Sequence, residues 1–260
     1  QIDSDADKLA GNPEPLPDSF EHSVQLALHA TNAALDAGTN RIILEFDTAA
    51  GDETYPLLSR TMKLVEPYLG RFAELEPMRS RRAQAADDEG PLPLQLLFPD
   101  EGTAALVVQK WKLPPGTLCR SMGRAPLAPR CAALLIIAPS ATDGPAVKRL
   151  LDEADEADVE MPFILFNPKL VDMQSTGYGL VGRELRSLVQ TSFEPVYVLK
   201  TYMGGALHRR YPGDYTLWRE SAAEASGYEC RYARYRRPSQ EEIEEGLSGD
   251  EADGGGGFEL

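Results

Sequence analysis

The sequence predicts a three-layer α/β fold, in which a mostly parallel mixed sheet is extended by a C-terminal antiparallel meander. Over the first two thirds of the chain, four short apolar segments alternate with helical patterns, as in parallel strands joined by helices. The last third is rich in β-branched and aromatic residues separated by short turns. No internal repeat is present, so we expect one α/β domain over residues 16–240, after a polar lead-in at 1–15.

The first half of the chain contains two of the predicted strands. In chain order, its elements are a helix at 17–38, a strand at 41–47, one or two helices at 55–76, a charged loop at 77–91, a strand at 92–100 and a helical or extended segment at 102–111. Asp18 or Ser19 is a suitable N-cap for the first helix, and Gly38 can end it. Pro67 lacks the N–H that a helix interior requires, so we expect it to break the second helical pattern.

The second half contains the other two parallel strands and the meander. Its elements are an exposed Pro- and Gly-rich loop at 113–129, a strand at 131–140, a helix at 143–158, a strand at 162–167, a helix at 180–191 and antiparallel strands between 195 and 237. The segment at 131–140 is apolar almost throughout, as expected for a parallel strand that is covered on both faces.

The charge of the chain is strongly acidic and unevenly placed. Formal net charge is −15, and the last twenty residues hold eight Asp and Glu residues and no basic residue. We therefore expect an acidic, Gly-rich tail at 241–260 after a mildly acidic globular part. This charge argues against general nucleic-acid binding.

Cysteine usage and hydropathy predict the compartment. The three cysteines are widely spaced and form no C-x-x-C pair, which favours reduced thiols in a non-secretory compartment. No stretch approaches the roughly 18 apolar residues of a membrane span. Residues 1–19 are polar and acidic, so no signal peptide is predicted, and the start at Gln1 leads us to expect a trimmed or processed chain.

Gly177, Gly179 and Gly182 have the G-x-G-x-x-G spacing of a dinucleotide-binding turn. Such a turn follows a strand directly, opens a helix that faces the pyrophosphate, and has an acidic residue about 20 positions later. Here the preceding strand ends well before the glycines, at Asn167, and residues 195–205 hold no Asp or Glu. A flexible connection into a helix is therefore the favoured interpretation.

The sequence holds no complete catalytic or metal-binding motif. The P-loop, G-x-S-x-G, H-E-x-x-H and kinase patterns do not occur. His22 and His29 lie two turns apart on one predicted helix, but no third ligand is close in sequence and His208 is distant. We therefore expect no metal site and no cofactor, and we assign no catalytic residue.

Polar residues follow the predicted strands where an open α/β sheet places its ligands. Asp100 follows the second strand, Ser140 the third and Asn167 the fourth. Because the carboxyl ends of parallel strands meet at one edge of a sheet, these side chains are candidates for a ligand pocket. The alternative is that they end strands and cap helices, which these residue types commonly do.

The last predicted strand alternates tyrosines with arginines in "YECRYARYRRP", residues 228–238. Such a segment can stack on nucleic-acid bases, contact an acidic protein surface, or form the exposed side of an edge strand. The acidic net charge makes nucleic acid the weakest of these interpretations. Together with four other residues, its arginines complete the candidates for partner binding, which are Trp111, Lys112, Arg209, Arg210, Arg231, Arg234, Arg236 and Arg237.

Several strings, taken together and in order, resemble a known family. They are "PDSFEHSVQLALHATNAALDAGTNRIILEF", "LQLLFPD", "FILFNPKL", "GREL" with "TSFEPVYVL", and "ALHRRYPGDYTLW" with "RRPSQEE". Over residues 15–243 the chain is similar to a plastid and cyanobacterial family of domains of unknown function. That family includes the chloroplast assembly factor called low photosystem II accumulation, and a related domain is appended to a chloroplast adenylate kinase. The order and spacing of the strings carry the resemblance, since no single string is diagnostic.

The resemblance implies a non-enzymatic auxiliary factor that binds photosystem II, or an assembly or repair intermediate of it, from the stromal side of the thylakoid. Its partners would be photosystem II core subunits or other assembly or repair factors, and its membrane association would be peripheral, through protein contacts. The family supplies no catalytic residues to transfer. The alternative is a small-ligand or nucleotide-binding α/β enzyme of the chloroplast stroma, suggested by the fold pattern and by the adenylate kinase association.

Overall fold

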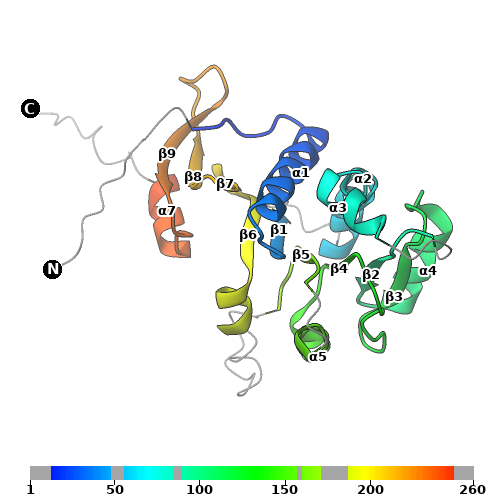
Figure 1. Cartoon of the computed structure of the whole chain (residues 1–260). Coiled ribbons are helices and arrows are strands. Elements are labelled where there is room, and N and C mark those ends of the chain that lie inside the picture. Colours follow the sequence, from blue (N-terminus) through cyan, green and yellow to red (C-terminus); the bar gives the residue numbers. More distant parts are fainter. Residues whose placement is uncertain (1–12, 48–55, 85–89, 157–159, 171–186, 249–260) are drawn as a thin grey trace, which may run out of the picture.

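The computed structural model describes residues 13–47, 56–84, 90–156, 160–170 and 187–248, whose strands form one nine-stranded sheet (Figure 1). The strands are β1 (Arg41–Asp47), β2 (Leu94–Phe98), β3 (Leu118–Ser121), β4 (Ala133–Ile137), β5 (Phe163–Phe166), β6 (Glu194–Tyr202), β7 (Gly205–Arg210), β8 (Tyr215–Glu220) and β9 (Tyr228–Arg234). Their order is β3-β2-β4-β5-β1-β6-β7-β8-β9. Strands β3 to β6 in this order are parallel, and β6 to β9 are antiparallel. The predicted fold class is therefore confirmed.

The helices lie in two layers on the sheet, on opposite sides of the strands (Figure 1). They are α1 (Phe20–Asp36), α2 (Leu57–Phe72), α3 (Glu76–Arg82), α4 (Glu101–Lys110), α5 (Gly144–Glu156) and α7 (Gln240–Ser248). Side chains alternate between the two faces of a strand. Helices α1 to α4 therefore cover the face of the sheet to which Ile42 and Leu44 of β1 point. Helix α5 packs on the opposite face, to which Ile43 points. Helix α7 packs on the antiparallel strands β8 and β9.

Both ends of α1 agree with their predicted signals. The Ser19 hydroxyl accepts a hydrogen bond of 3.1 Å from the backbone N–H of His22, so Ser19 is the N-cap. Gly38 follows the end of the helix with a φ of 81°, a conformation that glycine adopts without strain. Strand β1 then begins three residues later with the predicted boundaries.

Pro67 does not break α2, contrary to the prediction, because the helix continues through it. Pro67 lies on the solvent face, and so does Lys63, whose carbonyl loses its intrahelical partner and can bond water instead. On the opposite face, Leu64 and Tyr68 remain buried on either side of the proline. Packing of the apolar face on the sheet thus keeps the helix intact.

Two segments that we predicted to be loops contain regular structure. Helix α3 begins at Glu76 and continues into the segment at 77–91, where Met78 inserts into the core among charged neighbours. Strand β3 falls within the segment at 113–129 and pairs in parallel with β2. Only alternate residues of this four-residue strand are buried, a pattern too short to stand out among the surrounding Pro and Gly residues.

The first residues of the predicted tail, 241–248, belong to α7. Ile243 and Leu247 pack against the antiparallel strands. The contact is close, since a Cβ atom at Gly246 would lie 2.5 Å from Cδ2 of Leu217 on β8. Two apolar residues among acidic ones therefore contribute to holding this helix on the sheet.

Candidate functional site

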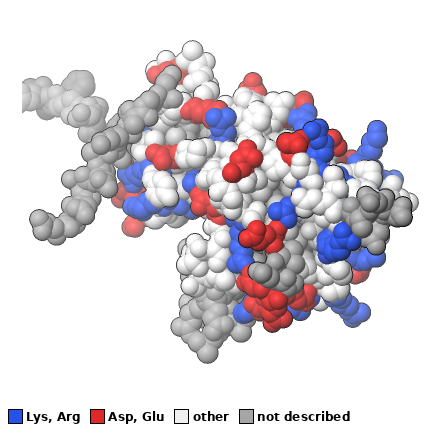
Figure 2. Space-filling view, in the orientation of Figure 1, with Lys and Arg blue, Asp and Glu red and all other residues white. Residues whose placement is uncertain are grey.

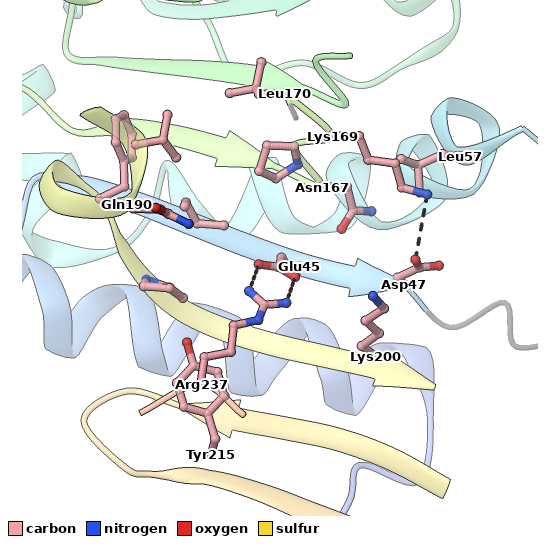
Figure 3. Close-up of a pocket in the computed structure, with 15 residues that line it drawn as sticks. Glu45, Asp47, Leu57, Asn167, Lys169, Leu170, Gln190, Lys200, Tyr215 and Arg237 are labelled. Carbon is pink, nitrogen blue, oxygen red and sulfur yellow. Dashed lines mark hydrogen bonds and ion pairs between the residues drawn. The ribbon is translucent and has the colours of Figure 1, made fainter. Parts of the chain in front are cut away.

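A trough of about 790 Å³ opens over the carboxyl ends of β1 and β5, on the face of the sheet that carries α5. Its lining comes from alternate residues of β1, from residues 167–170 after β5, from residues 189–193, and from β6. Leu57 at the start of α2, Tyr215 on β8 and Arg237, which lies between β9 and α7, complete it (Figure 3).

The connections of the chain explain why a trough forms here. Strands β1 and β5 are neighbours, but the chain leaves them toward opposite faces of the sheet. Helix α2 follows β1 on one face, whereas Leu188 and Val189, which precede β6, pack on the other. Crevices at such positions, outside the carboxyl ends of parallel strands, are where open α/β sheets bind ligands.

Asn167 ties the end of β5 to β1 and α2. Its Oδ1 accepts a hydrogen bond of 2.5 Å from the backbone N–H of Phe46, and its Nδ2 donates to the Phe46 carbonyl at 3.2 Å and to Thr61 Oγ1 at 2.7 Å. The residue is buried and has a φ of 46°, which asparagine tolerates better than most residues. Asn167 therefore acts as a structural clamp at the edge of the trough.

Glu45 and Arg237 form a bidentate ion pair in the trough, with Nη–Oε distances of 2.5 and 2.7 Å (Figure 3). Burial alone would lower the pKa of Arg237, but the hydrogen bonds and the charge of Glu45 raise it. The pair joins the central strand β1 to the segment that leads into α7. Because planar guanidinium and carboxylate groups match in two parallel hydrogen bonds, this contact fixes the geometry of that wall.

Asp47, Lys169 and Lys200 gather at the mouth of the trough (Figure 3). The Asp47 carboxylate lies 3.9 Å from Lys169 Nζ and 3.8 Å from Arg60 Nη2. Lys200 is opposite Asp47 in the register of β1 and β6, and its ammonium lies 5.3 Å from the centre of the Tyr202 ring. The mouth therefore combines one carboxylate with cations from three separate elements.

These charged residues were not among the candidates predicted from the sequence, although the pattern of the first strand indicates two of them. In "RIILEFD", Ile43, Glu45 and Asp47 share one face of a strand whose other face is wholly apolar. Charged residues on one face of a central strand indicate that this face is open or paired, since buried parallel strands are otherwise apolar. Lys169 and Lys200 carry no comparable signal.

The structure brings only one of the three predicted ligand candidates into the trough. Asp100 caps α4 by accepting from the Thr103 N–H at 2.8 Å, which holds the pKa of its carboxyl below the usual value. Ser140 forms a capping box with Asp143 before α5. Asn167 lines the trough, but its polar atoms are engaged by Phe46 and Thr61. All three therefore act locally as caps or clamps, which is the alternative that the sequence left open.

Gly177, Gly179 and Gly182 lie outside the described residues. The nearest described residues that line the trough on either side of them in sequence are Leu170 and Val189.

The four candidate partner-binding residues outside the Tyr-Arg segment lie at opposite ends of the sheet. Trp111 is partly buried and packs edge-to-face on Phe98, with ring centroids 6.3 Å apart, while Lys112 is exposed beside it. Arg209 is buried, donates to the Pro195 carbonyl at 2.8 Å and pairs with Glu194 at 2.7 Å. Arg210 pairs with Glu14 at 2.6 Å. The structure does not bring these residues into one surface.

The arginines of the predicted Tyr-Arg strand all have carboxylate partners. Arg231 contacts Glu229 at 3.1 Å, Arg234 and Arg236 both contact Glu242 on α7, and Arg237 contacts Glu45 as described above. Backbone and side-chain hydrogen bonds from Ser239 and Arg236 lower the pKa of Glu242 to about 2. Acidic and basic side chains are also interspersed over the face seen in Figure 2, which shows no continuous basic surface.

Three exposed apolar side chains belong to the elements at the β3 edge of the parallel sheet, and they point to different sides of it. Leu106 and Val108 on α4 are 50% and 59% exposed, and Leu118 on the neighbouring edge strand β3 is 38% exposed. A second exposed pair, Phe20 at the start of α1 and Met203 at the tip of the β6–β7 hairpin, borders a separate groove of about 580 Å³.

Burial holds two cysteines and one histidine in their neutral forms. Burial raises the pKa of the Cys119 and Cys131 thiols to about 11, so neither is a thiolate at neutral pH. Burial, together with the charge of Arg210, lowers the pKa of His208 to about 4. Within the described residues, no three His, Cys, Asp or Glu side chains gather as a metal site.

None of the helices in the described part of the chain is long and apolar enough to cross a bilayer. No curated protein and no solved structure matches the chain. A family model described as a domain of unknown function, DUF1995, matches residues 17–245. This match includes every described helix and strand except the last residues of α7. The chain therefore belongs to the DUF1995 family.

Proposed function

We propose that the protein is a non-enzymatic auxiliary factor that binds photosystem II, or an assembly or repair intermediate of it, from the stromal side of the thylakoid. The proposal follows the sequence resemblance to plastid and cyanobacterial proteins, and the family match to a domain of unknown function covers nearly the same residues, 17–245. Its location is the chloroplast stroma or the stromal face of the membrane. Its partners are photosystem II core subunits or other assembly and repair factors, reached through protein contacts.

The observation that supports a docking role is the exposure of three apolar side chains, Leu106 and Val108 on α4 and Leu118 on β3. Exposed apolar side chains at a sheet edge are available to contact a partner protein. Strand β3 is paired on one side only, and natural proteins usually protect such edges with charges or a covering segment. Here one exposed residue of β3 is Leu118, whose side chain lies on the opposite face of the sheet from α4. A partner that wraps around this edge would cover Leu118 together with α4.

A density-gradient experiment tests the docking role. The tagged protein is expressed in an alga or plant that lacks its own copy, and thylakoids are solubilised gently before and after strong light. We expect the wild-type protein to migrate with photosystem II core or sub-core particles. Migration as free protein in both conditions would contradict the proposal.

A pair of variants tests the surface itself. Leu106→Gln combined with Val108→Gln removes two apolar side chains that make little contribution to the core, so the fold should persist while the migration shifts to free protein. Ala105→Gln is the matched control, because Ala105 is exposed on the same helix and the change adds an amide without removing a large apolar group. Equal co-migration of the double variant and wild type would place the docking surface elsewhere.

A second candidate function, binding of a small ligand, rests on the trough over β1 and β5. The trough lies at the position where α/β sheets bind ligands, and its lining mixes apolar and charged side chains. A thermal-shift screen of small molecules against the full chain tests this function. A ligand at 100 times its dissociation constant adds about 2.7 kcal/mol of stability, which is readily measured.

A further inference from the structure

The lining of the trough selects a chemical class of ligand. We propose that the trough binds a small amphipathic anion, that is, an apolar body that ends in a phosphate or carboxylate group. This inference rests on the second candidate function above and does not depend on the docking role.

The charged groups of the trough leave positive charge at its mouth. Glu45 uses both carboxylate oxygens on Arg237, so this pair is neutral. Asp47 is the other carboxylate of the lining, and Lys169 lies 3.9 Å from it. In the part of the chain that the structure describes, Lys200 has no carboxylate within 4.0 Å. An anionic group beside the Lys200 ammonium, on the side away from Asp47, would give Lys200 a partner and compensate the excess charge.

One wall of the trough is apolar. Ile43, Leu170 and Phe193 are largely buried, and Val189 and Pro195 extend the same wall. A free inorganic anion would leave this wall uncovered, and a wholly apolar ligand would bring hydrocarbon against the Lys200 ammonium, which is costly unless the charge is paired. Only a ligand with both parts satisfies the whole trough.

The positions of the lysines set the orientation of the ligand. Lys169 follows β5 and Lys200 belongs to β6, and the two lie on either side of Asp47 (Figure 3). The apolar wall lies deeper along β1, toward Ile43. The anionic head therefore lies at the mouth and the apolar body points along the trough. Lysine ammonium groups act as point charges, so they can bind either a phosphate or a carboxylate head.

Isothermal titration calorimetry of the full chain with five simple probes tests the class. Octyl phosphate and octanoate carry both parts, octanol lacks the charge, inorganic phosphate lacks the apolar body, and butyl phosphate has a shorter chain. We expect octyl phosphate or octanoate to bind, and at least tenfold more tightly than butyl phosphate, octanol or phosphate, since each buried methylene alone contributes about fourfold. Comparing octyl phosphate with octanoate distinguishes the two head groups. Equal binding of octyl phosphate and octanol would overturn the proposal.

Charge-removing variants locate the site. Lys200→Gln and Lys169→Gln should each raise the dissociation constant of octyl phosphate by about tenfold, the loss of one ion pair in a partly dry site. Lys112→Gln is the matched control, because Lys112 is exposed at the opposite edge of the sheet. Unchanged affinity in both trough variants would refute the assignment. ADP is titrated as a further probe. If ADP binds while octyl phosphate and octanoate do not, the proposal of an amphipathic anion is refuted and the ligand-binding function still stands.

Discussion

Replacing Asn167 with alanine should destabilise the protein by about 3 kcal/mol. The substitution removes the acceptor of the buried Phe46 N–H and the donor to Thr61. A buried donor left without an acceptor costs about 1–3 kcal/mol. Alanine at a φ of 46° adds about 1 kcal/mol, because its Cβ crowds the backbone in the left-handed region. Urea denaturation at pH 7 measures the total change in the free energy of unfolding. An unchanged dependence on urea concentration confirms that unfolding remains two-state.

Two further variants separate the contributions. Asn167→Gly loses the same hydrogen bonds without the left-handed strain, but glycine also gains entropy in the unfolded chain, so it should differ from alanine by under about 1 kcal/mol. Asn32→Ala is the matched control, because Asn32 has a single hydrogen bond on the outer side of α1, to Asp36. We expect this control to change stability by less than about 0.5 kcal/mol. A cost below about 1 kcal/mol for Asn167→Ala would refute the clamp.

Two other predictions concern packing and pH. Gly205→Ala should cost about 3 kcal/mol, since its Cβ would lie 2.1 Å from the Trp218 carbonyl oxygen, whereas Gly70→Ala, with open space around it, should stabilise α2 by up to about 1 kcal/mol. Chemical denaturation of both variants checks the opposite signs. Folding lowers the pKa of His208 from 6.5 to about 4, so the unfolded chain binds its proton first as the pH falls, and stability is lost from about pH 6.5 down to about pH 4. This group alone should cost roughly 1.5 kcal/mol between pH 6.5 and 5, the loss should be missing in His208→Phe, and equal pH dependence of the two proteins would contradict it.

Periodicity predicted most parallel strands of the fold well. Contacts between residues that are distant in sequence explain the elements that it missed. The apolar run that forms β4 is unambiguous because both of its faces are covered. Pro67 has a strong propensity to end helices, but the packing of α2 on the sheet overrides it. Strand β3 depends on pairing with β2, a contact between distant residues that no local pattern contains.

The candidate site was harder to predict than the fold. Polar residues at strand ends indicated the edge of the sheet where the trough lies, and Asn167 does line the trough. Asp100 and Ser140 are also polar residues that follow strands, but they serve as caps because each is followed directly by a helix. Arg237 was placed among partner-binding residues, and its role in the trough depends on an ion pair with a residue 192 positions away.

That separation in sequence has a consequence for biosynthesis. Glu45 is made early and Arg237 late, so one wall of the trough is absent until nearly the whole domain has left the ribosome. Contacts between such distant residues also form slowly in folding, because a long loop must close first. A nascent or truncated chain can therefore build much of the parallel sheet while lacking a complete trough. Ligand binding would then report that synthesis and folding of the domain are finished.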